Sequence, residues 1–305
     1  MRYAFAKSLF RIAQKDQRII LLTGDLGYTV FEEFERFLPK QFINMGVAEA
    51  NMIGVAAGLA LSGFIPFVYS IATFATMRGY EQLRNDVCLH NANVKIVGSG
   101  AGLSYGHAGS THHALEDIAI TRILPGMCVL CPCDGYEVEA LLPQIVKRNG
   151  PVYLRLGKAG EPPVYSTCPG VKIGRANKIM KGTDVCCIAT GNLVYNAQKA
   201  AGILRKRNIS VEVIDMFTVK PLDLQLLKNL SRRFFHIITV EEHFTYGGLG
   251  GAVAEVLSQT KGKAQLTCIG TGDKFVEEVG NQQFLREQLN LTPKLLAKTI
   301  ENLLK

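Results

Sequence analysis

Hydrophobic positions in the first half of the chain alternate between two patterns: short apolar runs and longer segments with helical spacing. Apolar runs of this kind, bounded by glycine or polar residues, are typical of buried parallel strands. We expect strands at residues 19–23, 66–70, 94–98, 128–131 and 152–156. We expect helices at residues 4–14, 49–62, 73–89, 115–124 and 136–147. The regular succession of strand and helix predicts an α/β fold with a mostly parallel sheet flanked by helices.

This pattern is interrupted between residues 158 and 174, where prolines and glycines replace periodic apolar residues. Pro162, Pro163, Pro169, Gly160 and Gly170 fall within this stretch, and such a composition is typical of a linker between domains. Beyond it, strands are expected at residues 185–190, 211–215, 237–240 and 266–269, with helices starting near residues 195, 222 and 250. We therefore predict two α/β domains, residues 1–160 and 174–305, joined by a linker at residues 161–173.

Residues 51–77 contain no charged side chain and are numerous enough to span a bilayer. The turn-forming sequence at residues 62–66, Ser-Gly-Phe-Ile-Pro, divides the stretch. We therefore expect a buried helix, a turn and a buried strand, with no membrane span.

The net charge is +8, but the basic residues are scattered and form no stripe interleaved with aromatic side chains. We expect no nucleic-acid binding. A solvated basic surface, an acidic partner or a phosphorylated substrate would explain the charge equally well.

The eight cysteines follow no secretory leader, so we expect reduced thiols in a cytoplasmic protein. Cys128, Cys131 and Cys133 form the one cluster, at the end of an expected strand. Successive strand residues point to opposite faces, and no second Cys or His pair stands at ligand spacing. We expect no metal site there.

Glu49 stands in the first turn of a very apolar expected helix, after the sequence Asn-Met-Gly-Val-Ala. The carboxylate could simply favour the positive end of the helix. Alternatively, an apolar site could raise its pKa, so that the carboxyl shares a proton with a ligand nitrogen. Spacing alone favours the first explanation.

Phe74, Met77 and Tyr80 are three residues apart and would share one face of a helix. Such a stripe usually belongs to the core, but it would also serve as an apolar shelf for a flat heteroaromatic ring.

Residues 99–117 combine four glycines with three histidines, His107, His112 and His113, where an expected strand ends and a helix begins. Open α/β sheets place their ligands at this end of the strands. Three histidines within seven residues are a stronger signal than one. Zinc is the alternative, but no acidic or thiol fourth ligand stands at the usual spacing.

Two further segments are of interest. Arg155 lies in a buried strand and must find an anion, either a structural carboxylate or a substrate phosphate. Glycines 247, 248, 250 and 251 open a helix after Glu241, Glu242 and His243, where a phosphate cradle is conceivable, although the dinucleotide-binding spacing is absent.

Taken in order, these segments resemble the transketolase family and its relative deoxyxylulose-phosphate synthase, over essentially the whole chain. The most specific motifs are Gly-Val-Ala-Glu at residues 46–49, Thr-His-His at 111–113 and Val-Glu-Glu-His at 240–243. The resemblance implies a pyrimidine-binding domain followed by a transketolase C-terminal domain.

The resemblance also implies roles for individual residues. Glu49 would bond the aminopyrimidine ring of thiamine diphosphate, and Asp25 would lie near that cofactor. Phe74, Met77 and Tyr80 would form the shelf beneath the ring. His112 would bond donor oxygens and move protons, with His107 and His113 beside it at the substrate. Arg155 would hold a substrate phosphate.

Three positions depart from the family pattern. Met77 stands where the shelf often has a phenylalanine, Ala108 where an aspartate recognises a donor hydroxyl, and Gly100 where a histidine or arginine grips phosphate. We therefore expect the substrate to differ from the standard pentose-phosphate ketoses. A modified, nucleotide-linked or unphosphorylated sugar is the alternative.

The family's Gly-Asp-Gly motif, which holds the diphosphate and Mg²⁺, does not occur in this sequence, and the chain begins directly with the first helix of the pyrimidine domain. We therefore expect a separate N-terminal subunit that carries this motif and holds most of the Mg²⁺ site. The implied enzyme transfers a two-carbon ketol unit between sugars or sugar phosphates, as an α₂β₂ assembly, with a self-dimer as the other possibility. The alternatives are the β subunit of a 2-oxo-acid dehydrogenase and a non-catalytic scaffold subunit.

Overall fold

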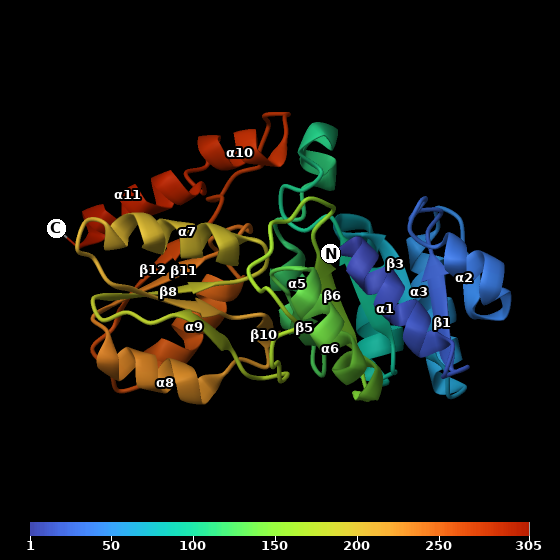
Figure 1. Ribbon diagram of the computed structural model, residues 1–305. Helices are drawn as coiled ribbons and strands as arrows, with labels where there is room; N and C mark the ends of the chain where they lie inside the picture. Colours follow the sequence, from blue (N-terminus) through green and yellow to red (C-terminus); the bar gives the residue numbers. More distant parts are fainter. Residues whose placement is uncertain (305) are drawn as a thin grey trace.

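The computed structural model describes residues 1–304, which fold into two α/β domains lying side by side (Figure 1). The blue-to-green half of the ribbon is built on a seven-stranded sheet and the yellow-to-red half on a five-stranded sheet. The α/β class with mostly parallel sheets is thus confirmed.

The first sheet has the strand order β10-β5-β6-β4-β3-β1-β2. Its strands are β1 (Ile19–Thr23), β2 (Phe42–Asn44), β3 (Ile65–Ile71), β4 (Lys95–Ser99), β5 (Cys128–Leu130), β6 (Val152–Leu156) and β10 (Thr218–Lys220). All pairs are parallel except β10 with β5. Because β10 comes from the second half of the chain, the two halves share this sheet.

The second sheet has the strand order β12-β11-β8-β9-β7. It consists of β7 (Asn177–Met180), β8 (Val185–Ala189), β9 (Val211–Asp215), β11 (His236–Val240) and β12 (Gln265–Ile269). Only β7 runs antiparallel, along β9.

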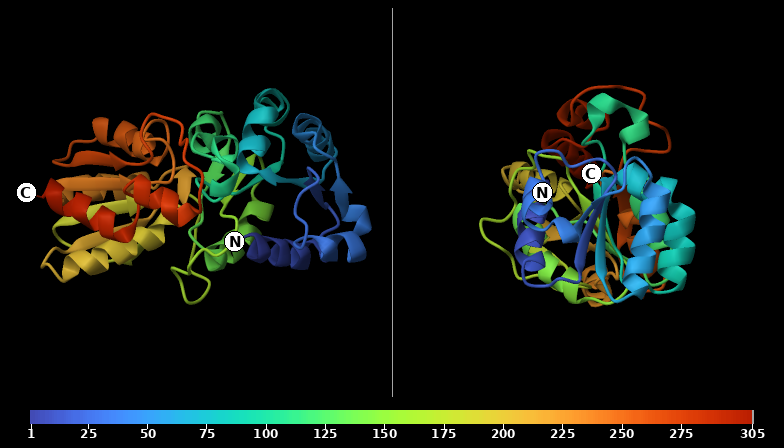
Figure 2. Two further views of the ribbon diagram at one scale, coloured as in Figure 1. Left: turned by 90° about the horizontal axis from the view of Figure 1, so that it is seen from above. Right: turned by 90° about the vertical axis from the view of Figure 1, so that its right-hand side faces the viewer.

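Helices cover both faces of each sheet, as the turned views of Figure 2 show. The helices of the first half are α1 (Arg2–Ala13), α2 (Glu32–Phe37), α3 (Glu49–Leu61), α4 (Tyr80–Gln82), α5 (Asp117–Arg122) and α6 (Gly135–Lys147). Those of the second half are α7 (Leu193–Arg205), α8 (Leu224–Arg233), α9 (Leu249–Ser258), α10 (Gln282–Gln288) and α11 (Pro293–Leu303). Each sheet consequently has two apolar cores, one per face.

The uncharged stretch at residues 51–77 forms most of α3, a turn and the fully buried strand β3. None of the helices among the described residues combines the length and apolar character needed to cross a membrane.

The helix expected at residues 73–89 is present, but it is interrupted at Gly79 and is mostly π-helical. This segment consists of two π-helical turns, η2 (Phe74–Arg78) and η3 (Leu83–Leu89), on either side of the short α4. Gly79 between them packs so closely on α3 that a Cβ there would lie 3.2 Å from the Ala50 Cα. Wide turns of this kind are frequent at functional sites.

Several elements were not predicted from the sequence: α2, β2, β7, β10, α10 and α11. The strands among them are short edge strands with mixed burial. A three- or four-residue strand carries too few positions for an alternating pattern to be recognised.

Candidate active site

The candidate site lies at the carboxyl ends of β1, β3 and β4, where a parallel sheet presents its loops. Glu49 is the first residue of α3, the helix that follows β2 and begins at this edge. The same edge receives Gly24 and Asp25 after β1, Ser70 near the end of β3, and the loop that follows β4.

Glu49 is almost fully buried, with 2% of its surface exposed. The hydroxyl of Ser70 donates to its Oε1 at 2.8 Å. Arg78 Nη1 donates to its Oε2 at 3.0 Å. A charge that merely favoured a helix end would be expected to lie in solvent, so this burial supports the binding explanation over the helix-end one.

Phe74 forms the aromatic surface beside Glu49. The guanidinium carbon of Arg78 lies 3.9 Å from the centre of its ring. The imidazole of His112 meets the same ring edge-on at a centroid distance of 5.0 Å. Arg78 and Phe74 together thus connect the carboxylate of Glu49 to the histidine loop.

The other two shelf residues are placed differently. Met77 is 39% exposed. Tyr80 packs against a core of the first domain, and its hydroxyl donates to Ile120 O at 2.8 Å. Because η2 is a π-helical turn, the spacing of three does not bring Phe74, Met77 and Tyr80 onto one regular α-helical face.

His112 is half-buried at the end of a short 3₁₀ turn, and its Nδ1 lies 2.9 Å from the hydroxyl of Thr111. Burial lowers the pKa of His112 below its ordinary value, and the positive charge of Arg78 lowers it further. The imidazole is therefore neutral at neutral pH, when it can accept a proton on one nitrogen and donate from the other.

The neighbouring histidines differ from one another. His107 is exposed. His113 is buried, and neither of its ring nitrogens has a hydrogen-bond partner within residues 1–304. Burial is the main cause that lowers the pKa of His113.

Asp25 follows Gly24 in a left-handed backbone conformation, φ 58°. Its Oδ1 accepts hydrogen bonds from Asn44 Nδ2 at 3.0 Å and from the hydroxyl of Tyr28 at 2.9 Å. These bonds, that of Asn44 first, lower the pKa of Asp25. Asp25 is thus a fixed, partly exposed carboxylate at the edge that holds Glu49.

Arg155 lies inside the protein, 3% exposed. Asp117 accepts from its Nε at 2.7 Å and from its Nη2 at 3.0 Å. The same Nη2 donates to the backbone oxygens of Ala114 and Glu242. Of the two anions considered for this arginine, the structure provides the structural carboxylate, so we do not include Arg155 among the proposed substrate ligands.

Gly100 has no room for the phosphate-gripping side chain of the family pattern. Its φ is +87°, and a Cβ there would collide with the ring of Tyr105. The ammonium group of Lys158 lies 4.5 Å from the centre of that ring. The space that a histidine or arginine would need at position 100 is therefore filled by Tyr105, with Lys158 over its ring.

The glycine-rich segment after β11 is not a phosphate cradle. The carboxylate of Glu241 already accepts from the backbone nitrogens of Leu249 and Gly250, both at 2.7 Å, at the start of α9. Glu242 is paired with Arg286, Nε to Oε1 at 3.0 Å. His243 accepts from Ala119 N of the first domain at 3.3 Å. This segment joins the two domains instead of binding a ligand.

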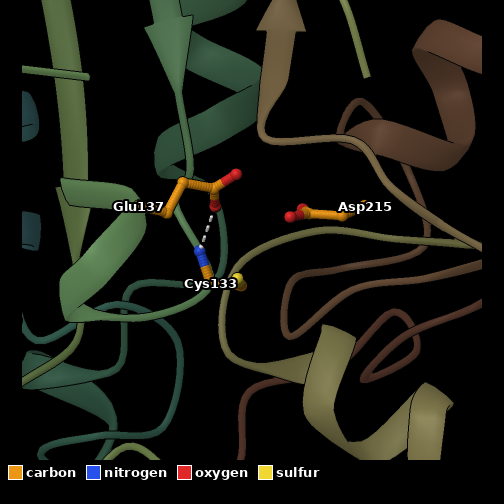
Figure 3. Close-up of side chains that lie close together, drawn as sticks. All are labelled: Cys133, Glu137 and Asp215. Atoms are coloured by element: carbon orange, nitrogen blue, oxygen red, sulfur yellow. Dashed lines mark hydrogen bonds between the residues drawn. The ribbon is translucent and has the colours of Figure 1, made fainter. Parts of the chain in front are cut away.

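One group among residues 1–304 has the proximity that metal binding needs: Cys133, Glu137 and Asp215, whose ligand atoms lie within 4.8 Å of one another (Figure 3). Asp215 points toward Glu137 and Cys133 from the second domain. Burial raises the pKa values of all three groups, which favours their protonated forms over metal-binding anions.

The two carboxyl groups of this cluster each have one buried oxygen that finds no hydrogen-bond partner in the described part of the chain, Oε1 of Glu137 and Oδ1 of Asp215. Their other oxygens accept from Cys133 N and from the Tyr165 hydroxyl, both at 2.8 Å. Carboxylate oxygens only accept, so these two free oxygens can satisfy each other when one carboxyl carries a proton.

Two family profiles match the chain. Residues 1–161 match the transketolase pyrimidine-binding domain and residues 174–294 match the transketolase C-terminal domain. The chain belongs to the transketolase family. Its resemblance to this family, inferred from three short motifs, is thereby confirmed.

Two relatives of this transketolase-family chain are named as subunits. One subunit of the apulose-4-phosphate transketolase of Phocaeicola vulgatus is 37% identical over 98% of this chain and 95% of its own length. The SqwH subunit of the 6-deoxy-6-sulfo-D-fructose transketolase of a Clostridium species is 38% identical over 98% of this chain and 92% of its own. A solved split-gene transketolase, an inactive tetramer of its β chain, superposes with a TM-score of 0.90 at 36% identity, covering 99% of this chain and 97% of that one.

Proposed function

We propose that this chain is the pyrimidine-binding subunit of a split transketolase, and that it transfers a two-carbon ketol unit between sugars together with a separate diphosphate-binding subunit. The observation that carries the proposal is the meeting of Glu49, Phe74 and His112 at one sheet edge in a chain of this family. We further propose that residues 1–160 form its pyrimidine-binding domain and residues 174–305 its C-terminal domain, with a linker at residues 161–173.

The residues at this edge fit the pyrimidine half of thiamine diphosphate. Glu49 Oε2 accepts a hydrogen bond at 3.0 Å from the planar guanidinium of Arg78. The same guanidinium lies over the ring of Phe74, 3.9 Å from its centre. A flat ring with a hydrogen-bonding nitrogen can make both contacts. When bound, thiamine diphosphate supplies the carbon nucleophile that carries the two-carbon unit.

Each residue then has a task that its surroundings support. Glu49 shares a proton with the ring nitrogen, and the hydroxyl of Ser70 fixes its other oxygen. Phe74 supports the face of the ring, with Met77 at the exposed margin and Asp25 at the neighbouring strand end. His112, neutral at working pH, moves protons at the oxygens of the donor sugar. His107 and His113 lie on the same loop, where the substrate would enter.

The diphosphate and Mg²⁺ require a partner that carries the Gly-Asp-Gly motif, because this sequence has none. Apolar side chains are exposed at both ends of α3: Val47, two residues before the helix, is 71% exposed, and Leu61, its last residue, is 65% exposed. No atom lies within 4 Å of a Cβ built at Gly58 on the same helix. Such a surface suits a closely packed partner chain. We propose an assembly with two copies of each subunit, or a self-dimer when the partner is absent.

The substrates we propose are sugars other than the standard pentose-phosphate ketoses. Three family contacts to the standard donors are weakened here: Gly100 is closed by Tyr105, Ala108 replaces the acid that recognises a donor hydroxyl, and Arg155 is bound internally. The two relatives are named for apulose 4-phosphate and 6-deoxy-6-sulfo-D-fructose, which are modified sugars. We propose a role in carbohydrate metabolism in the cytoplasm, where the eight unpaired cysteines would stay reduced.

The test is calorimetric binding of thiamine diphosphate and Mg²⁺ to this chain alone and to its mixture with a candidate partner. Tight binding in the mixture alone supports the proposal and justifies a screen of donor sugars. Tight binding to the chain alone would mean that the diphosphate site lies in this subunit. Absence of binding in both samples would favour a scaffold role or a different partner.

A further inference from the structure

Arg78 contacts both groups that the proposed function assigns to the pyrimidine ring. Its Nη1 lies 3.0 Å from Glu49 Oε2, and its guanidinium carbon lies 3.9 Å from the centre of the Phe74 ring. We propose that Arg78 is an internal plug of the pyrimidine site, which must leave Glu49 and Phe74 before the cofactor ring can bind. This inference rests on the proposed function, because it takes these two residues as the ring's binding partners.

The hydrogen bonds of Glu49 direct Arg78 and the ring nitrogen to the same oxygen. Oε1 is held by Ser70 at 2.8 Å, and a Cβ built at Gly24 would lie 3.3 Å from it. The remaining oxygen, Oε2, is bound to Arg78. A ring nitrogen therefore has to compete with the guanidinium for the same oxygen.

The stacking contact leads to the same conclusion. A separation of 3.9 Å is van der Waals contact between flat groups, so no second flat group fits between Arg78 and Phe74. The guanidinium is planar, donates hydrogen bonds in its plane and stacks through its faces. Like the guanidinium, an aminopyrimidine ring is flat and would hydrogen-bond to Glu49 and stack on Phe74.

Arg78 is able to leave. Its side chain is 45% exposed, whereas that of Glu49 is 1% exposed. Water around the exposed guanidinium screens its attraction to Glu49, which makes this partner easier to exchange for another. Arg78 also ends the π-helical turn η2 and is followed by Gly79, so no regular helix continues through it. The buried carboxylate is the fixed half of the pair and the arginine the mobile half.

The plug provides a physical reason why this subunit should bind the pyrimidine weakly on its own. Freeing Glu49 and Phe74 costs both the ion pair and the stacking contact. In the assembled enzyme the diphosphate contacts supplied by the partner would offset this cost, because they tether the ring beside the site. Cofactor binding would then be coupled to subunit assembly.

The experiment measures binding of the pyrimidine fragment 4-amino-5-hydroxymethyl-2-methylpyrimidine to the full chain by ligand-observed NMR. The variants are Arg78→Met, which keeps the aliphatic stem, and Arg84→Met, a matched control at an exposed arginine of η3 that bonds Asn85. We expect Arg78→Met to bind the fragment about tenfold more tightly than the unchanged chain. Arg84→Met should not change the affinity.

Glu49→Gln separates this inference from the proposed function. If Glu49→Gln abolishes fragment binding while Arg78→Met leaves the affinity unchanged or weakens it, the pyrimidine site stands and the plug is overturned. If Arg78→Met shows no binding at all, the plug is also overturned, because a freed carboxylate and ring should accept the fragment. If the fragment binds and Glu49→Gln has no effect, the assignment of Glu49 in the proposed function fails.

Discussion

Asp117 holds Arg155 through two hydrogen bonds inside the first domain, Nε to Oδ2 at 2.7 Å and Nη2 to Oδ1 at 3.0 Å. Both side chains are almost fully buried. Tyr153 donates to the same carboxylate, and Arg155 also donates to a backbone oxygen of the second domain. This pair thus links β6, α5 and the segment that follows β11.

Breaking this pair should destabilise the protein. Arg155→Met leaves Asp117 as a buried charge without its cation, so the free energy of unfolding should fall by about 3–5 kcal/mol. Urea unfolding measures the loss. Arg175→Met, at a half-exposed arginine paired with Asp223, should change stability by less than about 1 kcal/mol. An unchanged unfolding curve for Arg155→Met, with weaker binding of phosphorylated sugars only, would restore the phosphate role.

Glu49→Gln should abolish turnover without preventing assembly. The amide keeps the shape of the side chain but cannot share a proton with the ring nitrogen, so kcat should fall by at least about 100-fold. Steady-state kinetics and size-exclusion chromatography of the mixed subunits measure the two properties. Glu81→Gln, at an exposed residue of α4, is the control. Full activity of Glu49→Gln would contradict the catalytic assignment.

His112 should set the acidic limb of the pH–rate profile. Burial is the main cause that lowers its pKa, so the neutral imidazole persists to lower pH than an ordinary histidine would allow. We expect the limb below about pH 6.5. His112→Asn should remove the limb and lower kcat by about 100-fold or more. His90→Asn, at an exposed histidine just after η3 and outside the candidate site, should retain both the limb and the rate. A limb that survives in His112→Asn would assign it to another group.

Glu137 and Asp215 should make stability depend on pH on the alkaline side. Burial raises both pKa values above those of the unfolded chain, so the folded protein holds a proton that the unfolded chain releases. The stability this proton provides is fully present below the unfolded-state pKa and is lost as pH rises through the raised folded-state pKa. Asp134, on the same loop, accepts three backbone hydrogen bonds. As an acidic group it provides no positive charge that would favour the ionised forms of Glu137 and Asp215.

Glu137→Gln tests this dependence, since its amide can donate to Asp215 at any pH. Urea unfolding at a series of pH values above about pH 4 should show stability that falls with rising pH in the unchanged chain and a flat profile in the variant. Glu139→Gln, on the same helix, should keep the loss. If bound zinc stabilises the unchanged chain but not Cys133→Ser, the cluster is a metal site instead of a proton-sharing pair.

The sequence predicted the larger elements well because their patterns are long. Strands β1, β3, β4, β6, β8 and β9 are buried on both faces, and each appears as a short, mostly apolar run. The geometry of η2 could not be predicted in this way, because a π-helical turn and an α-helical turn share the same apolar residues.

The candidate site was predicted as a set of residues but not as a set of contacts. Glu49 and His112 lie in distinct motifs, whereas Arg78 stands in a segment expected to be an ordinary helix. Its position over Phe74 depends on the wide turn and on Gly79. The partner of Arg155 was equally undetermined, since Asp117 lies 38 residues away in sequence.

The antiparallel strand β10 has a consequence for how this protein can be cut. It covers β5, with Cys131 N donating to Phe217 O at 2.7 Å beside it, yet it follows β9 of the other domain in the chain. A fragment truncated in the linker would lose this strand and expose the backbone of β5 as a bare sheet edge. Exposed edges of this kind recruit other strands and promote aggregation. Expression of the first domain alone should therefore yield insoluble protein, unless residues 218–220 are grafted back.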